Sequence, residues 1–259
     1  MSEYPTSIGR SDADSITLLG HDLAGELMGQ VGFGELAFWL VAQRRPSAGE
    51  LRVFEGVLVA LADHGLTPSA IAARLTLTGA PESVQGALAA GLLGGGSRFL
   101  GTTEDCGRLL AGALAHEDTP PADDAGYDAV ATRVVSAARA AGQLLPGLGH
   151  PVHKAADPRT PVLIGLAAEA GVYGPHLRLF EAIGRVHPAI LGRTLPLNGA
   201  GACGAALADL GFPVETLRGF ALLARTAGLL GHLAEEQRRP IGLAIYDHVD
   251  RASDYRIDS

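Results

Sequence analysis

The chain has 259 residues, of which 47% are hydrophobic and 19% are charged, and its formal net charge is −8 at pH 7. This length can bury a sizeable core in one large domain or two, and the composition lacks the low hydrophobicity of disordered chains. The acidic balance argues against nucleic acid and anionic membranes as partners. Small molecules and other proteins remain as candidate ligands.

The cysteines and the apolar runs bear on where the protein resides. Cys106 and Cys203 are the only cysteines, too few for a disulfide framework and without metal-ligand spacing to a histidine. The first ten residues lack the apolar core of a signal peptide, and no run approaches the ~18 apolar residues of a membrane-spanning helix. We therefore expect a cytoplasmic protein with no membrane partner.

The first hundred residues indicate a polar arm followed by helices. Residues 1–20 are polar and turn-like. Ser47 and Glu50 have the spacing of a capping box, and the helix that they begin has an apolar stripe. Gly94-Gly95-Gly96 then leads into a flexible loop that contains Arg98. The helices predicted in this part cover 22–30, 35–42, 47–65, 67–77 and 80–93.

The remainder also has helical periodicity, interrupted by loops rich in glycine and proline. Residues 116–124 form the most loop-like segment, residues 188–191 are expected to be extended, and the tail from 241 is short and mixed. No segment shows the sustained alternation of a strand, so the sequence predicts an all-α fold. The helices predicted here cover 104–114, 125–142, 159–171, 175–186, 202–211 and 215–237.

Chemically capable residues are concentrated in the turn Leu144–Arg159, LLPGLGHPVHKAADPR. Gly147 and Gly149 allow positive φ and a close approach of the backbone to a ligand, while prolines stiffen the turn. Within ten residues the turn presents His150, His153, Lys154, Asp157 and Arg159. It is therefore a candidate ligand-binding loop, although an ordinary polar loop would have the same composition.

Other kinds of site have little support. The two histidines of GHPVH are three residues apart in a loop that contains proline, and there is no HExxH motif or cysteine pair, so we expect no metal. Residues 199–204 imitate GxGxxG, but no strand precedes them. No GxSxG sequence is present.

The remaining loop and helix-end residues suggest a site for a polycarboxylate. Arginines bind carboxylates in bidentate fashion, and neutral histidines can donate to a carbonyl or take a hydroxyl proton. The alternative is structural, with Arg98 paired to Glu104 and His232 a satisfied interior residue. The candidates for the site are His64, Arg98, His150, Arg225, Arg238 and Arg239.

Five motifs occur in order over about residues 50–243. They are Ala62-Asp63-His64-Gly65, Gly147-Leu148-Gly149-His150 with Lys154 and Asp157-Pro158-Arg159, Leu195-Pro196-Leu197-Asn198, Ala224-Arg225-Thr226-Ala227-Gly228, and Gly231-His232. Together they resemble the motifs of the citrate synthase superfamily. Within it, Gly96-Ser97-Arg98-Phe99 and Gly228-Leu229-Leu230-Gly231-His232 with Arg238 look more like citryl-CoA lyases, including the lyase portion of ATP-citrate lyase.

The resemblance implies a helical homodimer with a large domain from residues 1–100 and 205–259 and a small domain from residues 101–204. Its ligands would be coenzyme A, as an acyl-CoA substrate, and a small di- or tricarboxylate. The reaction would cleave or form a carbon–carbon bond between an acetyl-CoA unit and oxaloacetate or a related 2-oxo acid. The alternatives are a citrate or methylcitrate synthase and a non-catalytic acyl-CoA or carboxylate-binding homologue.

The same resemblance implies roles for individual residues. His64 would contact a substrate carboxylate or carbonyl, and His150 would be the acid/base at the citryl hydroxyl. The loop with Gly147, Leu148, Gly149 and Lys154 would hold coenzyme A and the thioester. The residues that would bind the carboxylate substrate are Arg98, Asn198, Arg225 and Arg238 or Arg239, the last two across a dimer interface.

This sequence departs from the family pattern at three places. The Asn-Val-Asp of the family is here Asn198-Gly199-Ala200, so the carboxylate that exchanges a proton with the acetyl methyl is missing. Phe99 and Leu100 stand where synthases have a histidine, and Pro151 stands where the family usually has arginine. Losing a general acid/base typically lowers the rate by 10²- to 10⁴-fold, so binding is better supported than the reaction.

Overall fold

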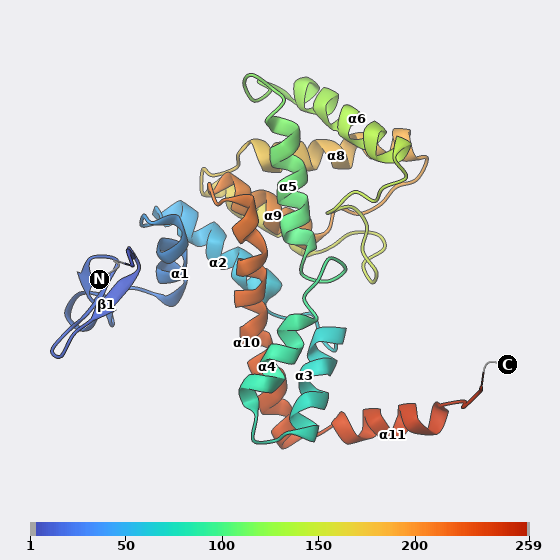
Figure 1. Cartoon of the computed structure of the whole chain (residues 1–259). Helices are drawn as coiled ribbons and strands as arrows, with labels where there is room; N and C mark the ends of the chain where they lie inside the picture. The colour runs from blue at the N-terminus through green and yellow to red at the C-terminus, as the bar shows by residue number, and fades with distance from the viewer. Residues whose placement is uncertain (1–3, 258–259) are drawn as a thin grey trace.

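The computed structural model describes residues 4–257, and helices dominate it (Figure 1). The all-α prediction is thus confirmed, apart from three short strands near the N-terminus. The helices are α1 (Phe33–Ala42), α2 (Ala48–Ala62), α3 (Pro68–Gly79), α4 (Val84–Leu93), α5 (Thr102–Leu114), α6 (Asp124–Ala140), α7 (Arg159–Glu169), α8 (Pro175–Leu191), α9 (Gly199–Asp209), α10 (Leu217–Arg238) and α11 (Gly242–Ala252).

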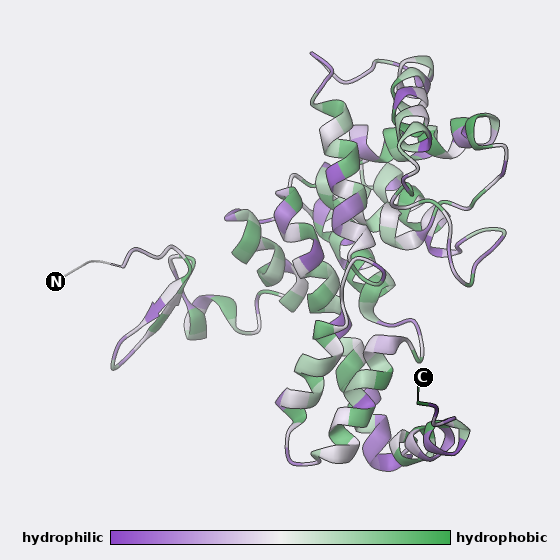
Figure 2. Cartoon of the chain, turned by 45° about the vertical axis from the view of Figure 1, so that its right-hand side comes forward, coloured by the Kyte–Doolittle hydropathy of each residue, from purple (hydrophilic) through white to green (hydrophobic). Residues whose placement is uncertain are grey.

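The N-terminal arm contains a small antiparallel sheet. Strands β1 (Gly9–Ser11), β2 (Ile16–Leu18) and β3 (His21–Asp22) lie in that order, with Gly9 opposite Leu18. A short π-helix, Leu23–Leu27, follows them. Each strand has only two or three residues. The alternation of apolar and polar residues, which is recognised over four or more positions, could therefore not reveal this sheet. The arm projects from the helical body in both views (Figures 1 and 2).

Local sequence signals begin several helices as predicted. At the start of α2, the Ser47 hydroxyl accepts the Glu50 N–H at 3.2 Å and the Glu50 carboxylate accepts the Ser47 N–H at 2.8 Å. This is a capping box. The Arg44 guanidinium also binds Glu50, and these bonds lower the pKa of Glu50 to about 2.

Two segments differ from the sequence-based expectation. Residues 188–191 are helical rather than extended, because α8 continues through Pro188 and ends where Gly192 adopts φ +69°. The tail forms the helix α11. At the start of this helix, the carboxylate of Glu236 accepts the backbone N–H groups of Ile241 and Gly242. Both features depend on contacts that a single-sequence pattern does not show.

Helix α9 lies at the centre of the main core. It is buried along nearly its whole length and packs against α5, α7, α8 and α2. Its small residues allow this, since a Cβ on Gly204 would lie 2.1 Å from the carbonyl oxygen of Thr103 in α5. Cys106 and Cys203 are free and buried in this core, and burial raises the pKa of Cys203 to about 12 and that of Cys106 further.

A second, smaller apolar cluster lies beside the main core. It joins α3, α4 and the C-terminal half of α10 through Ala73, Leu77, Ala87, Leu229 and Leu233. The N-terminal half of α10 belongs to the main core, so this helix links the two clusters (Figure 1). The proposed domain boundary near residue 204 stays a prediction. In the part of the chain that the structure describes, no helix is long and apolar enough to cross a membrane.

We expect Gly204→Ala to destabilise the protein by about 1–3 kcal/mol, because the added methyl group must separate α5 from α9. Chemical denaturation measures this free energy. Gly165→Ala in α7 is the matched control, since its Cβ would meet nothing within 4 Å and the change should stabilise the helix by about 0.5–1 kcal/mol. Equal stabilities for the two variants would contradict the close-packing explanation.

Candidate active site

A cavity of about 910 Å³ collects most of the predicted site residues. Its lining comes from the segment after α2, the loop before α5, the 144–152 loop, the start of α9 and the middle of α10. The cavity-lining residues among the predictions are His64, Arg98, Gly147, Leu148, Gly149, His150, Asn198 and Arg225. The structure does not bring Lys154, Arg238 or Arg239 into this lining.

The loop that carries His150 is held in a defined conformation. Gly147 and Gly149 both have φ +87°, which only glycine adopts readily. The Gly149 N–H donates to the Pro196 carbonyl at 2.7 Å, and the Asn198 N–H donates to the Gly147 carbonyl at 2.9 Å. The loop therefore pairs with the segment before α9, although the two are about fifty residues apart in sequence.

Asn198 ties the loop to α9 through its side chain. As the N-cap of α9, its amide oxygen accepts the Gly201 N–H at 2.9 Å, and its amide nitrogen donates to the Gly149 carbonyl at 2.7 Å. Both ends of the amide are thus bound to the backbone. Asn198 lines the cavity, but its contacts in this structure are those of a scaffold residue, so its predicted substrate contact stays a prediction.

Asp157 and Arg159 form a second anchor at the same place. The buried Asp157 carboxylate accepts the Arg159 guanidinium at 2.7 and 3.0 Å and the Gly199 N–H at 2.8 Å. Burial opposes ionisation of Asp157, but these donors outweigh burial and hold its pKa well below the ordinary range. A Cβ on Gly199 would lie 2.5 Å from Arg159 Nε, so glycine here leaves room for the guanidinium.

The hydrogen bonds of His150 define its tautomer. Its Nδ1 accepts the backbone N–H groups of Val152 at 3.1 Å and His153 at 2.9 Å. A nitrogen that accepts two N–H groups carries no proton, so the ring proton of neutral His150 is on Nε2. Burial, together with the nearby His153, lowers the pKa of His150 and favours the neutral ring. His150 is therefore a hydrogen-bond donor at Nε2.

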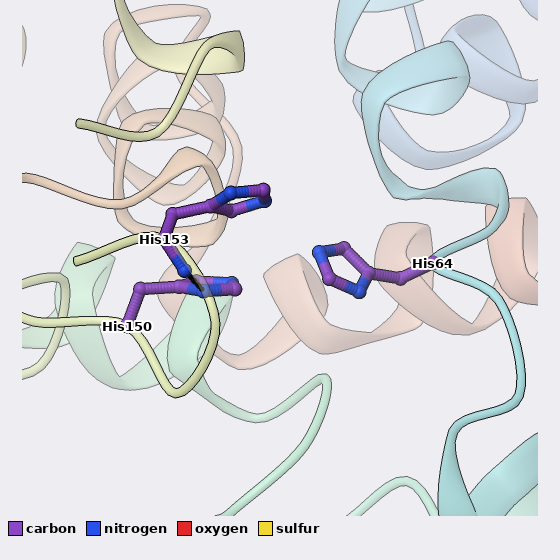
Figure 3. Close-up of side chains that lie close together, drawn as sticks. All are labelled: His64, His150 and His153. Carbon is purple, nitrogen blue, oxygen red and sulfur yellow. Dashed lines mark hydrogen bonds between the residues drawn. The ribbon is translucent and has the colours of Figure 1, made fainter. Parts of the chain in front are cut away.

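Three imidazoles meet beside the cavity (Figure 3). The ring centroids of His150 and His153 are 4.4 Å apart and the rings are inclined by 30°, while His64 lies 5.3 Å from His150 and 5.5 Å from His153. One nitrogen from each ring lies within 4.8 Å of the others, a grouping that could hold a metal ion. However, a metal-bound histidine usually donates from its other nitrogen, whereas His150 Nδ1 accepts.

Arg225 presents an incompletely satisfied guanidinium to the cavity. It is 4% exposed, it donates from one terminal nitrogen to Asp63 at 3.2 Å, and its buried Nε has no hydrogen-bond partner among the described residues. Burial lowers the pKa of Arg225 below its usual value. A largely desolvated guanidinium that lines a cavity is a favourable place for a carboxylate.

Asp63 connects Arg225 to a chain of charged side chains behind the cavity. Its carboxylate also accepts His232 Nε2 at 2.9 Å, and His232 Nδ1 accepts Arg74 Nε at 3.2 Å. The buried Arg74 then binds Glu236 at 3.0 Å. His232 is accordingly a satisfied interior residue, and this chain fixes the backbone next to His64.

The cavity is positively charged although the protein is acidic. Arg98, Arg159 and Arg225 line it, and within residues 4–257 Asp105 is the only carboxylate in the lining. Glu104 pairs with Arg108 and Arg218 rather than with Arg98. Ala200 also lines the cavity and supplies no acid or base. The arrangement can bind an anion and donate hydrogen bonds to it.

Arg159 and His153 belong to the turn in which chemistry was expected, but neither was among the predicted site residues. Arg159 was part of a family motif, but nothing in the sequence showed that it reaches the cavity. His153 was set aside with the metal alternative, because the third imidazole, His64, comes from a segment far away in the sequence. Only the fold brings the three rings together.

Comparisons with known proteins agree with the fold and the motifs. A sequence profile described as "Citrate synthase, C-terminal domain" matches residues 10–243. The citryl-CoA lyase from Hydrogenobacter thermophilus superposes with a TM-score of 0.86 and 27% identity, covering 99% of this chain and 95% of that one. The structure of ATP citrate lyase from Methanothrix soehngenii in complex with citrate and coenzyme A superposes with a TM-score of 0.79 and 23% sequence identity. The match covers 100% of this chain and 42% of that chain.

A curated relative is longer than this chain. The probable ATP-citrate synthase of Dictyostelium discoideum is 24% identical over 246 residues, which cover 89% of this chain and 38% of the relative. This chain therefore spans only a minor part of that protein.

We expect Asp157→Asn to cost about 3 kcal/mol at pH 7, because it leaves the Arg159 cation poorly paired. Because the pKa of Asp157 is lower in the folded state than in the unfolded state, ionised Asp157 stabilises the fold at pH values above the ordinary carboxyl pKa. This stabilisation is lost as the pH falls from the ordinary carboxyl pKa toward the folded-state pKa. The stability difference between wild type and variant should thus shrink as the pH falls from 5 to 2. Urea denaturation across that range measures it, with the exposed Asp118→Asn as control; a difference independent of pH would contradict the assignment.

Proposed function

The chain belongs to the citrate synthase family, and we propose that it is a citryl-CoA lyase-like enzyme. It would cleave, or form, the carbon–carbon bond between an acetyl-CoA unit and oxaloacetate or a related 2-oxo acid. The observation that carries this proposal is that His64, His150, Arg225 and the Gly147–Gly149 loop line one cavity together. The similarity to a citryl-CoA lyase over nearly the full length of both chains supports it.

The two ends of the cavity suit the two parts of citryl-CoA. The guanidinium of Arg225, which lines the cavity, and the exposed Arg98 would bind the carboxylates of a di- or tricarboxylate. The 144–152 loop would hold coenzyme A and the thioester, with Leu144, Leu148 and Val152 providing apolar surface. Lys154, which donates to the His150 carbonyl at 3.2 Å, would support this loop rather than reach the cavity.

The proposed chemistry follows from the state of His150. In cleavage, the citryl hydroxyl loses its proton, the carbon–carbon bond breaks, and its electron pair passes to the thioester as an enolate. The Nε2–H of His150 would donate to the oxygen that becomes the oxaloacetate carbonyl, lowering the energy of its negative charge. This makes His150 a donor to that oxygen, a more specific role than the acid/base assigned from the sequence.

A second candidate, an acyl-CoA or carboxylate-binding homologue without catalysis, is favoured by one observation. Ala200 is in the cavity lining, at the position where the family has its aspartate. One assay distinguishes the candidate functions. Purified protein is incubated with citryl-CoA, and the oxaloacetate that forms is measured by its reduction in a coupled enzymatic reaction. We expect oxaloacetate and acetyl-CoA to form. Saturable coenzyme A binding without turnover would indicate the binding protein, and free coenzyme A from acetyl-CoA and oxaloacetate would indicate a citrate or methylcitrate synthase.

For Arg225→Gln we expect kcat/KM for citryl-CoA to fall by about a hundredfold, because the carboxylate loses a charge-assisted hydrogen bond in a buried site. Steady-state kinetics measures this, and circular dichroism checks that the variant folds. Arg133→Gln, at an exposed position of helix α6, is the control and should retain full activity. An Arg225→Gln variant as active as the control would remove Arg225 from the substrate site.

We also propose that the chain acts as a cytoplasmic homodimer. Helix α11 projects from the body and exposes Leu243, Tyr246 and Val249 at a spacing of three residues (Figures 1 and 2). Arg238 and Arg239 lie at the end of the preceding helix and do not line the cavity of their own chain, so they would act across the interface.

Light scattering should give twice the mass of one chain for the wild type. The Tyr246→Glu variant should have a lower average mass, closer to that of the monomer, because a charge would enter an apolar contact. The exposed Val59→Glu on α2 is the control. A monomeric wild type at micromolar concentration would refute the dimer.

A further inference from the structure

The proposed cleavage needs a group that takes a proton from the citryl hydroxyl and a group that returns one to the enolate carbon. The position that carries a carboxylate elsewhere in the family is Ala200 in this chain. If the proposed function holds, another side chain must exchange these protons in place of the missing carboxylate.

The nearby carboxylates are poorly placed for this task. Asp157 is buried and accepts hydrogen bonds from Arg159 and Gly199, so it is fully engaged. Asp105 lines the cavity, but it faces Arg218 at 3.8 Å, and an ion pair makes a carboxylate a weaker base. An imidazole has an ordinary pKa near neutrality and suits both directions of transfer.

The three imidazoles differ in their freedom to accept a proton. His150 already carries its proton on Nε2, because its Nδ1 is occupied by two backbone N–H groups. In residues 4–257, the rings of His64 and His153 have no protein hydrogen bond, so either can present a free lone pair. His64 follows directly on Asp63, which binds Arg225, and therefore belongs to the carboxylate end.

His153 lies in the loop proposed to hold the thioester, just outside the cavity lining. One nitrogen of its ring lies within 4.8 Å of nitrogens of His64 and His150, which do line the cavity. Its ring stacks on His150 at 4.4 Å and faces His64 at 5.5 Å (Figure 3). Its backbone N–H keeps the Nδ1 of His150 in the acceptor state. A substitution of the side chain leaves that backbone bond in place, so the ring of His153 can be tested separately from the state of His150.

We propose that His153 is the proton acceptor of this enzyme and replaces the family's carboxylate. In cleavage, its imidazole takes the hydroxyl proton as the carbon–carbon bond breaks and the electron pair moves to the thioester. The resulting imidazolium then gives the same proton to the enolate carbon, which forms the methyl group of acetyl-CoA. The ring returns to neutrality and no proton is gained or lost overall.

The test is His153→Gln, with the exposed His116→Gln as control. We expect kcat for citryl-CoA to fall by 10²- to 10⁴-fold, while KM changes by less than about threefold because the carboxylate contacts remain. Exogenous imidazole should partly restore turnover to His153→Ala, which a merely structural role would not allow. A kcat within threefold of wild type in His153→Gln would overturn the proposal.

A partial reaction separates this inference from the proposed function. In deuterium oxide, the protein with acetyl-CoA and a non-condensing hydroxy diacid should exchange the acetyl methyl protons, as followed by mass spectrometry, and His153→Gln should lose the exchange. If wild type does not cleave citryl-CoA, the proposed function fails and this exchange alone decides the role of His153. Equal exchange in both proteins, or none in wild type, would refute that role.

Two further results bear on the same inference. Adding Ala200→Asp to His153→Gln should raise kcat about tenfold or more, because a general base contributes at least this much and an aspartate in the first turn of α9 is compatible with the helix dipole. If kcat of the double variant were no higher than that of His153→Gln, the proposal that His153 replaces the family's carboxylate would be contradicted. Loss of wild-type turnover with a chelator and its return with Zn²⁺ would show that the cluster holds a metal ion, and would overturn the proposal.

Discussion

The candidate site depends on how the 144–159 loop is fastened to the start of α9. Asn198 and Asp157 do this from opposite sides: the amide of Asn198 reaches the Gly149 carbonyl, and the carboxylate of Asp157 holds the Gly199 N–H and the Arg159 guanidinium. Both side chains satisfy backbone groups that a helix start leaves unpaired. The direction in which His150 points follows from these bonds and from the two positive-φ glycines.

A second polar structure fixes the opposite wall. The series Arg225, Asp63, His232, Arg74 and Glu236 runs from the cavity to the start of α11. Its buried charges, those of Arg225, Arg74 and Glu236, are tolerated because each is paired. A ligand carboxylate that binds Arg225 therefore meets a cation that the protein has already oriented.

Much of the fold could be predicted from sequence, and the reasons are local. The capping box of Ser47 and Glu50 and the apolar stripe of α2 are signals within a few residues, and the structure reproduces them. The strands of the arm were too short for periodicity, and the continuation of α8 through Pro188 depends on packing. Of the site, the sequence motifs indicated most cavity residues, including His64, but they did not show that Arg159 reaches the cavity or that His153 lies beside His64 and His150. Their positions result from contacts between segments roughly forty to a hundred residues apart.

The two cysteines of the main core have a practical consequence. Both thiols are buried and hard to ionise, and the thiolate is the form that reacts with disulfide reagents. The folded protein should therefore give almost no background in a colorimetric thiol titration. Coenzyme A released by a synthase or a thioesterase would be visible in that titration even at high protein concentration, whereas a lyase, whose products include no free thiol, would leave the solution colourless.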